Sequence, residues 1–399
     1  MLVIAAALAA IGLAPSALLM PRSAVSPSFR TTHPALLPLL RQKASAASPR
    51  SLPPAMQAEE SAVAPEMEAM CIEDEAVEEC VIAQWPAGKI AVSQSVAETA
   101  KLGGLFFSWF FLNVMYNITN KRCQNAFPMP WTMTVVSLFV GIPWVLMLWA
   151  TGIRKAPKLD WKGMKTLLPI GAAHALGHAG AVIALGAGAV SFAQTVKAAE
   201  PVFTCVLSYF VLGTVFKPQV YASLFPIIVG VSLASLKELS FTMRSLVGAL
   251  TSNVAFASRA VLSKKTMDKP VGENITPPNL YGVLTIMAFL FSFPFALYYE
   301  GPGFMAAWKL ATAKVGAFWL TRQMILDGLY YYAYNEVAFV ALNKVSPVTH
   351  SIANTIKRVC IILATVLVFG NKMTGLGAAG SAIAIFGTFV YSIAKSKYK

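Results

Sequence analysis

Charged residues are scarce in this sequence: only 13% of its 399 residues are Asp, Glu, Lys or Arg, whereas 56% are hydrophobic. The mean hydropathy is +0.61, and soluble domains carry about a quarter charged residues. Because a membrane-spanning helix needs about 20 apolar residues, the chain has room for about ten such helices. No long polar stretch remains for a soluble catalytic domain. The composition predicts an all-α polytopic membrane protein and excludes most classes of enzyme.

Residues that build disulfide, metal or catalytic sites are also few. The five cysteines are scattered and include no CxxC pair, so they predict neither a disulfide framework nor a metal site. His174 and His178 lie one helical turn apart, but no carboxylate or thiol lies near them in the sequence. The acid–base pair or metal cluster that a membrane-embedded enzyme needs is missing. We therefore expect no metal, no other cofactor and no enzymatic activity.

Acidic residues are spread unevenly, and this divides the chain. Residues 1–20 are apolar and resemble a secretory signal peptide, with a genuine membrane span as the alternative. Residues 21–57 contain five basic residues and no acidic one, which is typical of a transit peptide. An acidic run follows, and we expect residues 58–97 to form a disordered linker. Signal and transit compositions in tandem predict a plastid membrane, either the inner envelope or an outer membrane of a secondary plastid.

The remaining residues, 98–399, form the predicted ten-helix membrane domain, which contains 26 basic but only 9 acidic residues. The basic residues lie in short loops and inside apolar segments, so they favour membrane lipid or an anion as the partner, and not nucleic acid. No feature of the sequence sets the oligomeric state. Apolar runs of spanning length occur at about 102–118, 131–152, 164–188, 189–212, 220–236, 244–262, 280–300, 315–342, 347–369 and 373–394.

Short motifs recur between the two halves of this domain. They are Val190-Ser191 with Val345-Ser346, Gln194-Thr195-Val196-Lys197 with Asn354-Thr355-Ile356-Lys357, and Asn120-Lys121-Arg122 with Ser263-Lys264-Lys265. An odd number of helices in each half makes the halves inverted in the membrane. The repeat predicts ten transmembrane helices as two inverted five-helix repeats, with a substrate site near the midplane between them. Chance similarity of short apolar segments is the alternative.

Several ionisable residues lie inside the apolar runs, where a charge costs about 2.5–3.5 kcal/mol on insertion scales. Five are basic and three are acidic: Lys197, Arg259, Arg322, Lys357 and Arg358 against Glu200, Asp327 and Glu336. Even complete internal pairing leaves two cations without an anion. A phosphate monoester carries close to two negative charges near neutral pH and accepts hydrogen bonds from Lys and Arg. We therefore predict that Lys197, Lys357 and Arg358 bind a phosphate group.

Structural interpretations of the same residues stay open. Lys357 and Arg358 could reach the membrane interface or pair with Glu336, and Lys197 could pair with Glu200. Arg322 and Asp327 are most simply a structural pair outside the site.

Three further residues are weaker candidates for substrate contacts. Arg259 lies near a helix end, and His178 and Tyr334 could either donate hydrogen bonds to a substrate or simply pack. Asn117-Ile118-Thr119 matches the acceptor pattern for N-glycosylation, but we expect no glycosylation of this motif in a plastid membrane.

The segments around the two lysines resemble a known family. They are Ala-Val-Ser-Phe-Ala-Gln-Thr-Val-Lys-Ala-Ala-Glu-Pro at 189–201 and Ser-Pro-Val-Thr-His-Ser-Ile-Ala-Asn-Thr-Ile-Lys-Arg-Val at 346–359. They are similar to the signature segments of the plastid phosphate translocators, in the drug/metabolite transporter superfamily, and the likeness extends over about residues 100–394. The resemblance implies the ten-helix inverted repeat and strict exchange of inorganic phosphate for a phosphorylated sugar or acid. It implies that Lys197, Lys357 and Arg358 bind the phosphate, while His178, Arg259 and Tyr334 contact the rest of the substrate.

Individual motifs resemble different branches of that family. Ala179-Gly180-Ala181 lacks the hydroxyl cluster usual in the triose-phosphate branch and is closer to the hexose- and pentose-phosphate branches. His174-Ala-Leu-Gly-His178 and Phe369-Gly-Asn-Lys372 resemble the triose-phosphate branch, whereas Ser346-Pro-Val-Thr-His350 resembles the phosphoenolpyruvate branch. We expect exchange of phosphate for phosphorylated three-carbon compounds, namely triose phosphate and 3-phosphoglycerate. Hexose-phosphate, pentose-phosphate or phosphoenolpyruvate exchange stays open, and a nucleotide-sugar carrier is a more distant alternative.

Overall fold

The computed structural model describes residues 79–85, 88–236, 238–239, 241–266, 271–345, 347–371 and 373–398. The predicted signal-like segment (1–20) and transit-like segment (21–57) lie outside these ranges. The same is true of the first part of the predicted linker, up to residue 78.

A short antiparallel hairpin precedes the helices. Strands β1 (Glu79–Trp85) and β2 (Gly88–Ser93) pair from Glu79 opposite Ser93 to Trp85 opposite Gly88. β-branched residues, which favour strands, occur in both segments, and β1 also contains an aromatic residue, Trp85. The hairpin is an exception to the all-α expectation. Within the predicted linker (58–97), the described part therefore consists of this hairpin and the first residues of a helix.

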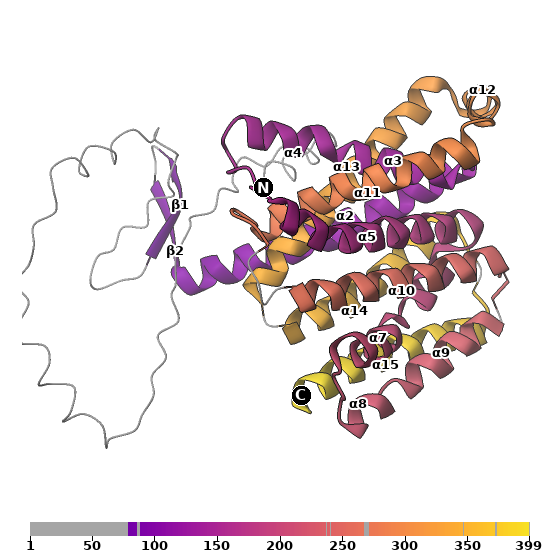
Figure 1. The fold of residues 1–399 in the computed structure, drawn as a ribbon. Helices are drawn as coiled ribbons and strands as arrows, with labels where there is room; N and C mark the ends of the chain where they lie inside the picture. The colour runs from indigo at the N-terminus through magenta and orange to yellow at the C-terminus, as the bar shows by residue number, and fades with distance from the viewer. Residues whose placement is uncertain are drawn as a thin grey trace, which may run out of the picture. The chain divides into compact units, whose positions relative to one another are not determined.

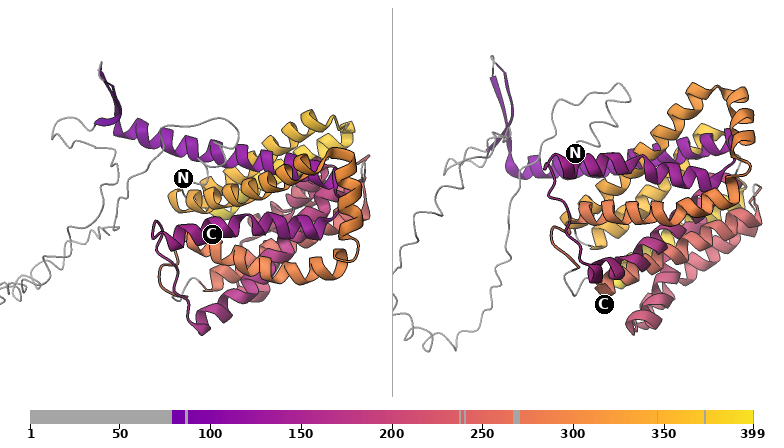
Figure 2. Two further views of the ribbon diagram at one scale, coloured as in Figure 1. Left: turned by 90° about the horizontal axis from the view of Figure 1, so that it is seen from above. Right: turned by 45° about the horizontal axis from the view of Figure 1, so that its top comes forward.

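The rest of the described chain is helical. Long helices run side by side, roughly parallel or antiparallel to one another (Figure 1). Figure 2 shows the same arrangement from two other directions. In chain order the helices are α2 (Gln94–Ala126), α3 (Pro130–Phe139), α4 (Gly141–Ala150), α5 (Trp161–Ala187), α6 (Val190–Lys197), α7 (Glu200–Leu212), α8 (Pro218–Ala222), α9 (Phe225–Leu236), α10 (Met243–Thr266), α11 (Pro277–Glu300), α12 (Phe304–Val315), α13 (Ala317–Lys344), α14 (Pro347–Phe369) and α15 (Gly375–Lys397).

Most of the predicted membrane spans are present. Among the described residues, nine helical segments are long and apolar enough to span a membrane, from Glu98–Ala126 to Gly375–Lys397, and each overlaps a predicted apolar run. The predicted run at 315–342 corresponds to α13, which has 28 residues but is not one of the nine. It contains Arg322, Asp327, Glu336 and Lys344. The structure thus confirms a helical protein with several candidate membrane spans.

Two helix pairs pack with their backbones in close approach. A Cβ atom added at Gly180 of α5 would lie 2.8 Å from the carbonyl oxygen of Gly248 in α10. A Cβ atom added at Gly230 of α9 would lie 2.3 Å from the nitrogen of Ala384 in α15. Only glycine leaves room for these crossings, because small residues let neighbouring helices approach closely in membranes. The α5–α10 crossing lies beside the candidate site described below.

Glu300, the last residue of α11, caps the beginning of α3. Its carboxylate accepts hydrogen bonds from the backbone N–H of Trp131 at 3.0 Å, and from the N–H and hydroxyl of Thr132 at 2.7 and 2.8 Å. Helix α3 begins at Pro130, and its N-cap residue Met129 provides no side-chain hydrogen bond. A carboxylate from another helix therefore satisfies the free N–H groups and the positive end of the helix dipole.

Lys121 of α2 caps the end of α5 in the complementary way. Its ammonium donates to the carbonyl oxygens of Leu185 at 2.9 Å, Gly186 at 3.4 Å and Gly188 at 2.8 Å. These carbonyls surround the last residue of α5, Ala187, where the helix leaves acceptors unpaired. The contact fixes the short connection from which α6 begins, and α6 supplies one of the predicted phosphate-binding residues.

Candidate functional site

The fourth predicted span is broken at its centre. We expected one run over 189–212, but α6 ends at Lys197 and α7 begins at Glu200. Pro201 explains the break, since it has no N–H to donate to the carbonyl of Lys197 four residues earlier. Lys197 thus lies at the C-terminal end of α6, and Glu200 lies at the N-terminal end of α7. Each charge has the sign that the adjoining helix dipole favours.

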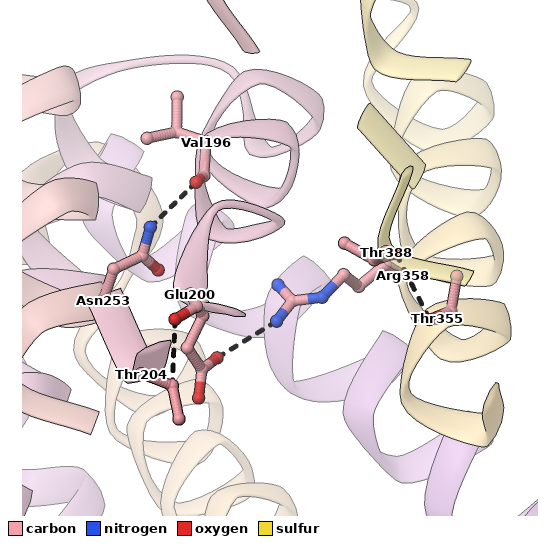
Figure 3. A network of polar contacts seen from close by, with 7 residues as sticks. All are labelled: Val196, Glu200, Thr204, Asn253, Thr355, Arg358 and Thr388. Carbon is pink, nitrogen blue, oxygen red and sulfur yellow. Dashed lines mark hydrogen bonds and ion pairs between the residues drawn. The ribbon is translucent and has the colours of Figure 1, made fainter. Parts of the chain in front are cut away.

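Asn253 of α10 holds the broken segment in place. Its side-chain amide donates to the carbonyl oxygen of Val196 at 2.8 Å (Figure 3). The Lys197 ammonium lies 5.2 Å from the ring centroid of Phe256, one turn further along α10. Among the described residues, Lys197 has no ion-pair or hydrogen-bond partner. Its three N–H donors therefore remain available to a ligand.

Lys357 and Arg358 project from α14. The Lys357 ammonium lies 4.7 Å from the ring centroid of Trp109 in α2, and it too has no ion pair in the described part of the chain. The Arg358 guanidinium points towards α7 and forms an ion pair with Glu200 at 3.1 Å (Figure 3). Two helices distant in sequence are thereby joined at the predicted site.

The alternative ion pairs considered for these residues are wrong. Glu336 pairs with Arg154, which precedes α5, and not with Lys357 or Arg358. Glu200 pairs with Arg358 and not with Lys197. Both acids are therefore engaged, and neither neutralises the two lysines directly.

Arg259 and the histidines form a second group of contacts. Arg259 Nη1 lies 2.7 Å from His174 Nδ1, and its guanidinium carbon lies 4.9 Å from the centroid of the Phe256 ring. His174 Nε2 in turn lies 3.3 Å from the hydroxyl of Tyr331. Since His174 is engaged by Arg259, the pair of histidines has no metal-like arrangement, and no cluster of three or more metal-ligating side chains occurs in the described ranges.

His178 and Tyr334 lie on the aromatic side of the same group. The His178 ring stacks on Tyr331 with centroids 3.9 Å apart, and Tyr334 contacts Tyr116 and Tyr331 at 5.4 and 5.7 Å. His178 Nε2 is buried without a hydrogen-bond partner among the described residues. A buried polar atom of this kind requires a partner, which a ligand could provide.

The structure brings all six predicted residues to a single cavity of about 370 Å³: Lys197, Lys357, Arg358, Arg259, Tyr334 and His178. The cavity is also lined by polar and aromatic residues that the sequence analysis did not select, among them Trp109, Asn113, Asn117, Gln194, Asn335, His350 and Lys395. Polar side chains inside apolar runs were the available signal for the amides, because burying an amide in a membrane span requires a partner.

The cavity is strongly electropositive. Five basic residues line it, whereas Glu200 is the one acidic residue among the described lining residues. Arg322, Asp327 and Glu336, which the sequence analysis counted, do not line the cavity, whereas Lys395 of α15 does. Lys197 and Lys357 have no acidic partner among the described residues, so an anionic ligand would compensate their charges.

Asp327 belongs to a separate buried cluster. One oxygen of its carboxylate accepts hydrogen bonds from Ser137 at 2.6 Å and from Asn120 at 3.3 Å. The expected pair with Arg322 is wrong, because Asp327 is fully buried and Arg322 is exposed. Residues five positions apart on a helix point about 140° away from each other.

Comparison with known proteins identifies the family to which the chain belongs. The model of the Triose-phosphate Transporter family matches residues 100–392. The chain belongs to that family. The matched region contains all six predicted residues and confirms the resemblance seen in the sequence.

Relatives of this chain in the Triose-phosphate Transporter family are named after different sugar phosphates. Glucose-6-phosphate/phosphate translocator 2 of Arabidopsis thaliana is 41% identical over 303 residues, covering 75% of this chain and 76% of the relative. The xylulose 5-phosphate/phosphate translocator of the same plant is 39% identical, covering 78% and 74%. The triose phosphate/phosphate translocator of Flaveria trinervia is 40% identical, covering 74% and 72%. All three are chloroplastic.

These relatives of the Triose-phosphate Transporter family are transporters and not enzymes. Together with the apolar helices, they identify this chain as a multi-pass transporter of a plastid membrane. Because the identities are nearly equal, sequence similarity alone does not separate the sugar phosphates.

Proposed function

We propose that this transporter exchanges inorganic phosphate for phosphorylated three-carbon compounds, triose phosphate and 3-phosphoglycerate, by alternating access. The observation behind the proposal is the cavity whose described lining has five basic residues and one acidic residue. A phosphate dianion supplies two negative charges to this cavity and has enough oxygens to accept from several donors.

Lys197, Lys357 and Arg358 bind the phosphate in this proposal. Both ammonium groups lie over aromatic rings and have no other acceptor in the described chain, and the Arg358 guanidinium is oriented by Glu200. Arg358 can offer a planar pair of N–H donors, whereas the two lysines act as movable point charges.

Arg259, His178 and Tyr334 contact the remainder of the substrate. His178 Nε2 lacks a partner, and Arg259 is oriented by His174. All three side chains line the cavity with the phosphate-binding group. Their mixture of donors suits carbonyl, carboxylate or hydroxyl oxygens.

Ten transmembrane helices as two inverted five-helix repeats are the proposed architecture, with α13 as the eighth span. Support comes from Lys197 and Lys357, which occupy equivalent positions of the sequence repeat and line the same cavity. The proposed second and seventh spans also pack together through α3 and α11, and the fifth and tenth through α9 and α15.

The proposed domain organisation follows the sequence: a signal-like segment 1–20, a transit-like segment 21–57, a linker 58–97 and a transporter domain 98–399. The membrane is the inner plastid envelope or an outer membrane of a secondary plastid.

Exchange of hexose or pentose phosphates is the second candidate. It is favoured by Ala181, which lines the cavity where a larger hydroxylated residue would reduce the space. Two relatives also have glucose 6-phosphate and xylulose 5-phosphate in their names. Phosphoenolpyruvate or nucleotide-sugar transport lacks a comparable observation.

The test is counter-exchange in vesicles that contain purified carrier and are preloaded with phosphate. Replacing Lys197, Lys357 or Arg358 singly by Gln should reduce phosphate uptake at least about 10-fold, because each loses a bond to a charged group. Lys309→Gln is the matched control, since Lys309 is exposed on α12 outside the cavity. Near-normal uptake by one of the three variants, at equal abundance, removes that residue from the site.

A further inference from the structure

Three side-chain amides form a continuous row along one wall of the cavity. Asn113 and Asn117 lie one turn apart on α2, and Gln194 lies on α6. Asn117 Nδ2 donates to the side-chain oxygen of Asn113 at 2.9 Å and to its backbone carbonyl at 2.8 Å. Gln194 Nε2 donates to Asn117 Oδ1 at 2.8 Å. We call these three residues the amide row.

The hydrogen bonds give the amide row a direction. Asn117 is fully used, because its amide donates to Asn113 and its oxygen accepts from Gln194. Each end of the row retains one group without a partner among the described residues: the Nδ2 donor of Asn113 and the Oε1 acceptor of Gln194. Both side chains line the cavity. A ligand in the cavity thus meets a hydrogen-bond donor at one end and an acceptor at the other.

The amide row lies beside the phosphate-binding group. Trp109, Asn113 and Asn117 follow at intervals of four residues and so share one face of α2. Trp109 lies under the Lys357 ammonium at 4.7 Å. Gln194 precedes Lys197 by three residues on α6, which is about one helical turn. The row therefore runs from the neighbourhood of one phosphate-binding lysine to that of the other.

All three side chains of the amide row are buried. Asn113, Asn117 and Gln194 are 4%, 2% and 7% exposed. The two open ends face the cavity, so a ligand there can hydrogen-bond to the Asn113 donor and the Gln194 acceptor. Burial within a span also removes the glycosylation motif at Asn117 from consideration, and assigns this residue to the row instead.

We infer that the amide row binds hydroxyl groups of the cargo, so that the transporter takes hydroxylated phosphate monoesters in preference to hydroxyl-free ones. This rests on the proposed phosphate site. A hydroxyl both donates and accepts, which matches the two open ends of the row. A carboxylate only accepts, so it can bond to the Asn113 donor but is repelled by the oxygen of Gln194. Phosphoenolpyruvate, which has no hydroxyl, therefore gains least from the row, and sugar phosphates with several hydroxyls gain most.

The experiment compares cargoes as competitors of labelled phosphate uptake, using the full-length carrier in phosphate-loaded vesicles. The competitors are triose phosphate, xylulose 5-phosphate and phosphoenolpyruvate, and the readout is the ratio of their inhibition constants. Asn113→Leu and Gln194→Leu each remove one open end; the first keeps the number of side-chain heavy atoms and the second removes one. Gln194→Leu should raise the inhibition constants of the hydroxylated cargoes about 3- to 10-fold relative to that of phosphoenolpyruvate, the equivalent of one neutral hydrogen bond. Asn113→Leu should raise the inhibition constants of all three cargoes, because hydroxyl and carboxylate oxygens both accept from the amide.

Gln124→Leu is the matched control, because Gln124 is a buried amide on the same helix that does not line the cavity. Its ratio should stay at the wild-type value. If Asn113→Leu lowers the abundance of the protein, the smaller Asn113→Ala tests the same donor. An unchanged ratio in Gln194→Leu, with phosphate exchange measurable, overturns the inference. Absence of phosphate exchange in the wild type contradicts the proposed function instead.

Discussion

Gly180 and Ala181 are neighbouring small residues on α5 with unlike surroundings. Ala181 lines the cavity, whereas a side chain at Gly180 would meet the carbonyl of Gly248 and the nitrogen of Ser252 at 2.8 and 2.9 Å. Ala181→Thr adds a hydroxyl and removes space, so we expect a higher ratio of triose-phosphate to hexose-phosphate uptake. Gly180→Thr should instead reduce the amount of folded protein, because the two helices must separate. Uptake ratios and abundance in membranes measure the two effects.

Comparing the two variants separates the effect of cavity volume on substrate choice from the effect of helix packing on folding. An unchanged uptake ratio for Ala181→Thr would place the choice between three- and six-carbon cargoes elsewhere. Normal abundance of Gly180→Thr would show that the α5–α10 crossing tolerates a side chain.

At the scale of single residues, the sequence predicted which side chains line the cavity better than the contacts between them. Charge inside an apolar run selected Lys197, Lys357 and Arg358, which line the cavity, but also Arg322, Asp327 and Glu336, which do not. The partner of an acid was not predictable, because Glu336 bonds to Arg154 across 182 positions of the chain. Such pairs depend on which helices are neighbours, and hydropathy does not specify that.

The break between α6 and α7 sets the position of Lys197. Pro201→Ala restores an N–H group four residues after the Lys197 carbonyl, so α6 and α7 can join into one continuous helix. We expect the melting temperature to be retained or raised, while phosphate exchange falls at least about 10-fold because Lys197 and Glu200 are displaced. Melting of the purified protein and uptake into vesicles provide the two measurements. Wild-type exchange in this variant would show that the break is dispensable.

Among the elements, long apolar runs predicted the candidate spans to within several residues. The sequence analysis missed the break at Lys197, the short helix α12 and the hairpin of β1 and β2. Hydropathy reports how much apolar chain is available to cross the membrane. It does not report where a proline interrupts hydrogen bonding or whether a connection is itself helical. These features depend on backbone geometry and neighbouring contacts.

The electropositive cavity has a consequence for the whole transport cycle. Without an anion, the cations would be enclosed together, and uncompensated buried charge costs several kcal/mol per ion. Each 1.4 kcal/mol added to the barrier slows a step about tenfold. The empty carrier should therefore return slowly. Vesicles loaded with buffer alone should take up labelled phosphate at least about 10-fold more slowly than vesicles preloaded with phosphate or triose phosphate.

Preloading with chloride at equal ionic strength provides the control for internal salt. Equal uptake rates with and without internal phosphate would falsify obligatory exchange. That outcome would favour a uniporter or an ion-coupled carrier.

The fixed charges that line the cavity, including the ion pair between Glu200 and Arg358, make it resemble an ion-exchange resin with a single site. Its fixed cations are part of the polymer. Glu200 already compensates Arg358, whereas Lys197 and Lys357 have no acidic partner among the described residues and can take a mobile counter-ion. In such a material, selectivity begins with valence. A monovalent anion such as chloride compensates one of these lysines, whereas a dianion compensates both in a single binding event. The protein can therefore reject the abundant small anions of the cell through the number of its fixed charges, before the shape of the cargo is compared at all.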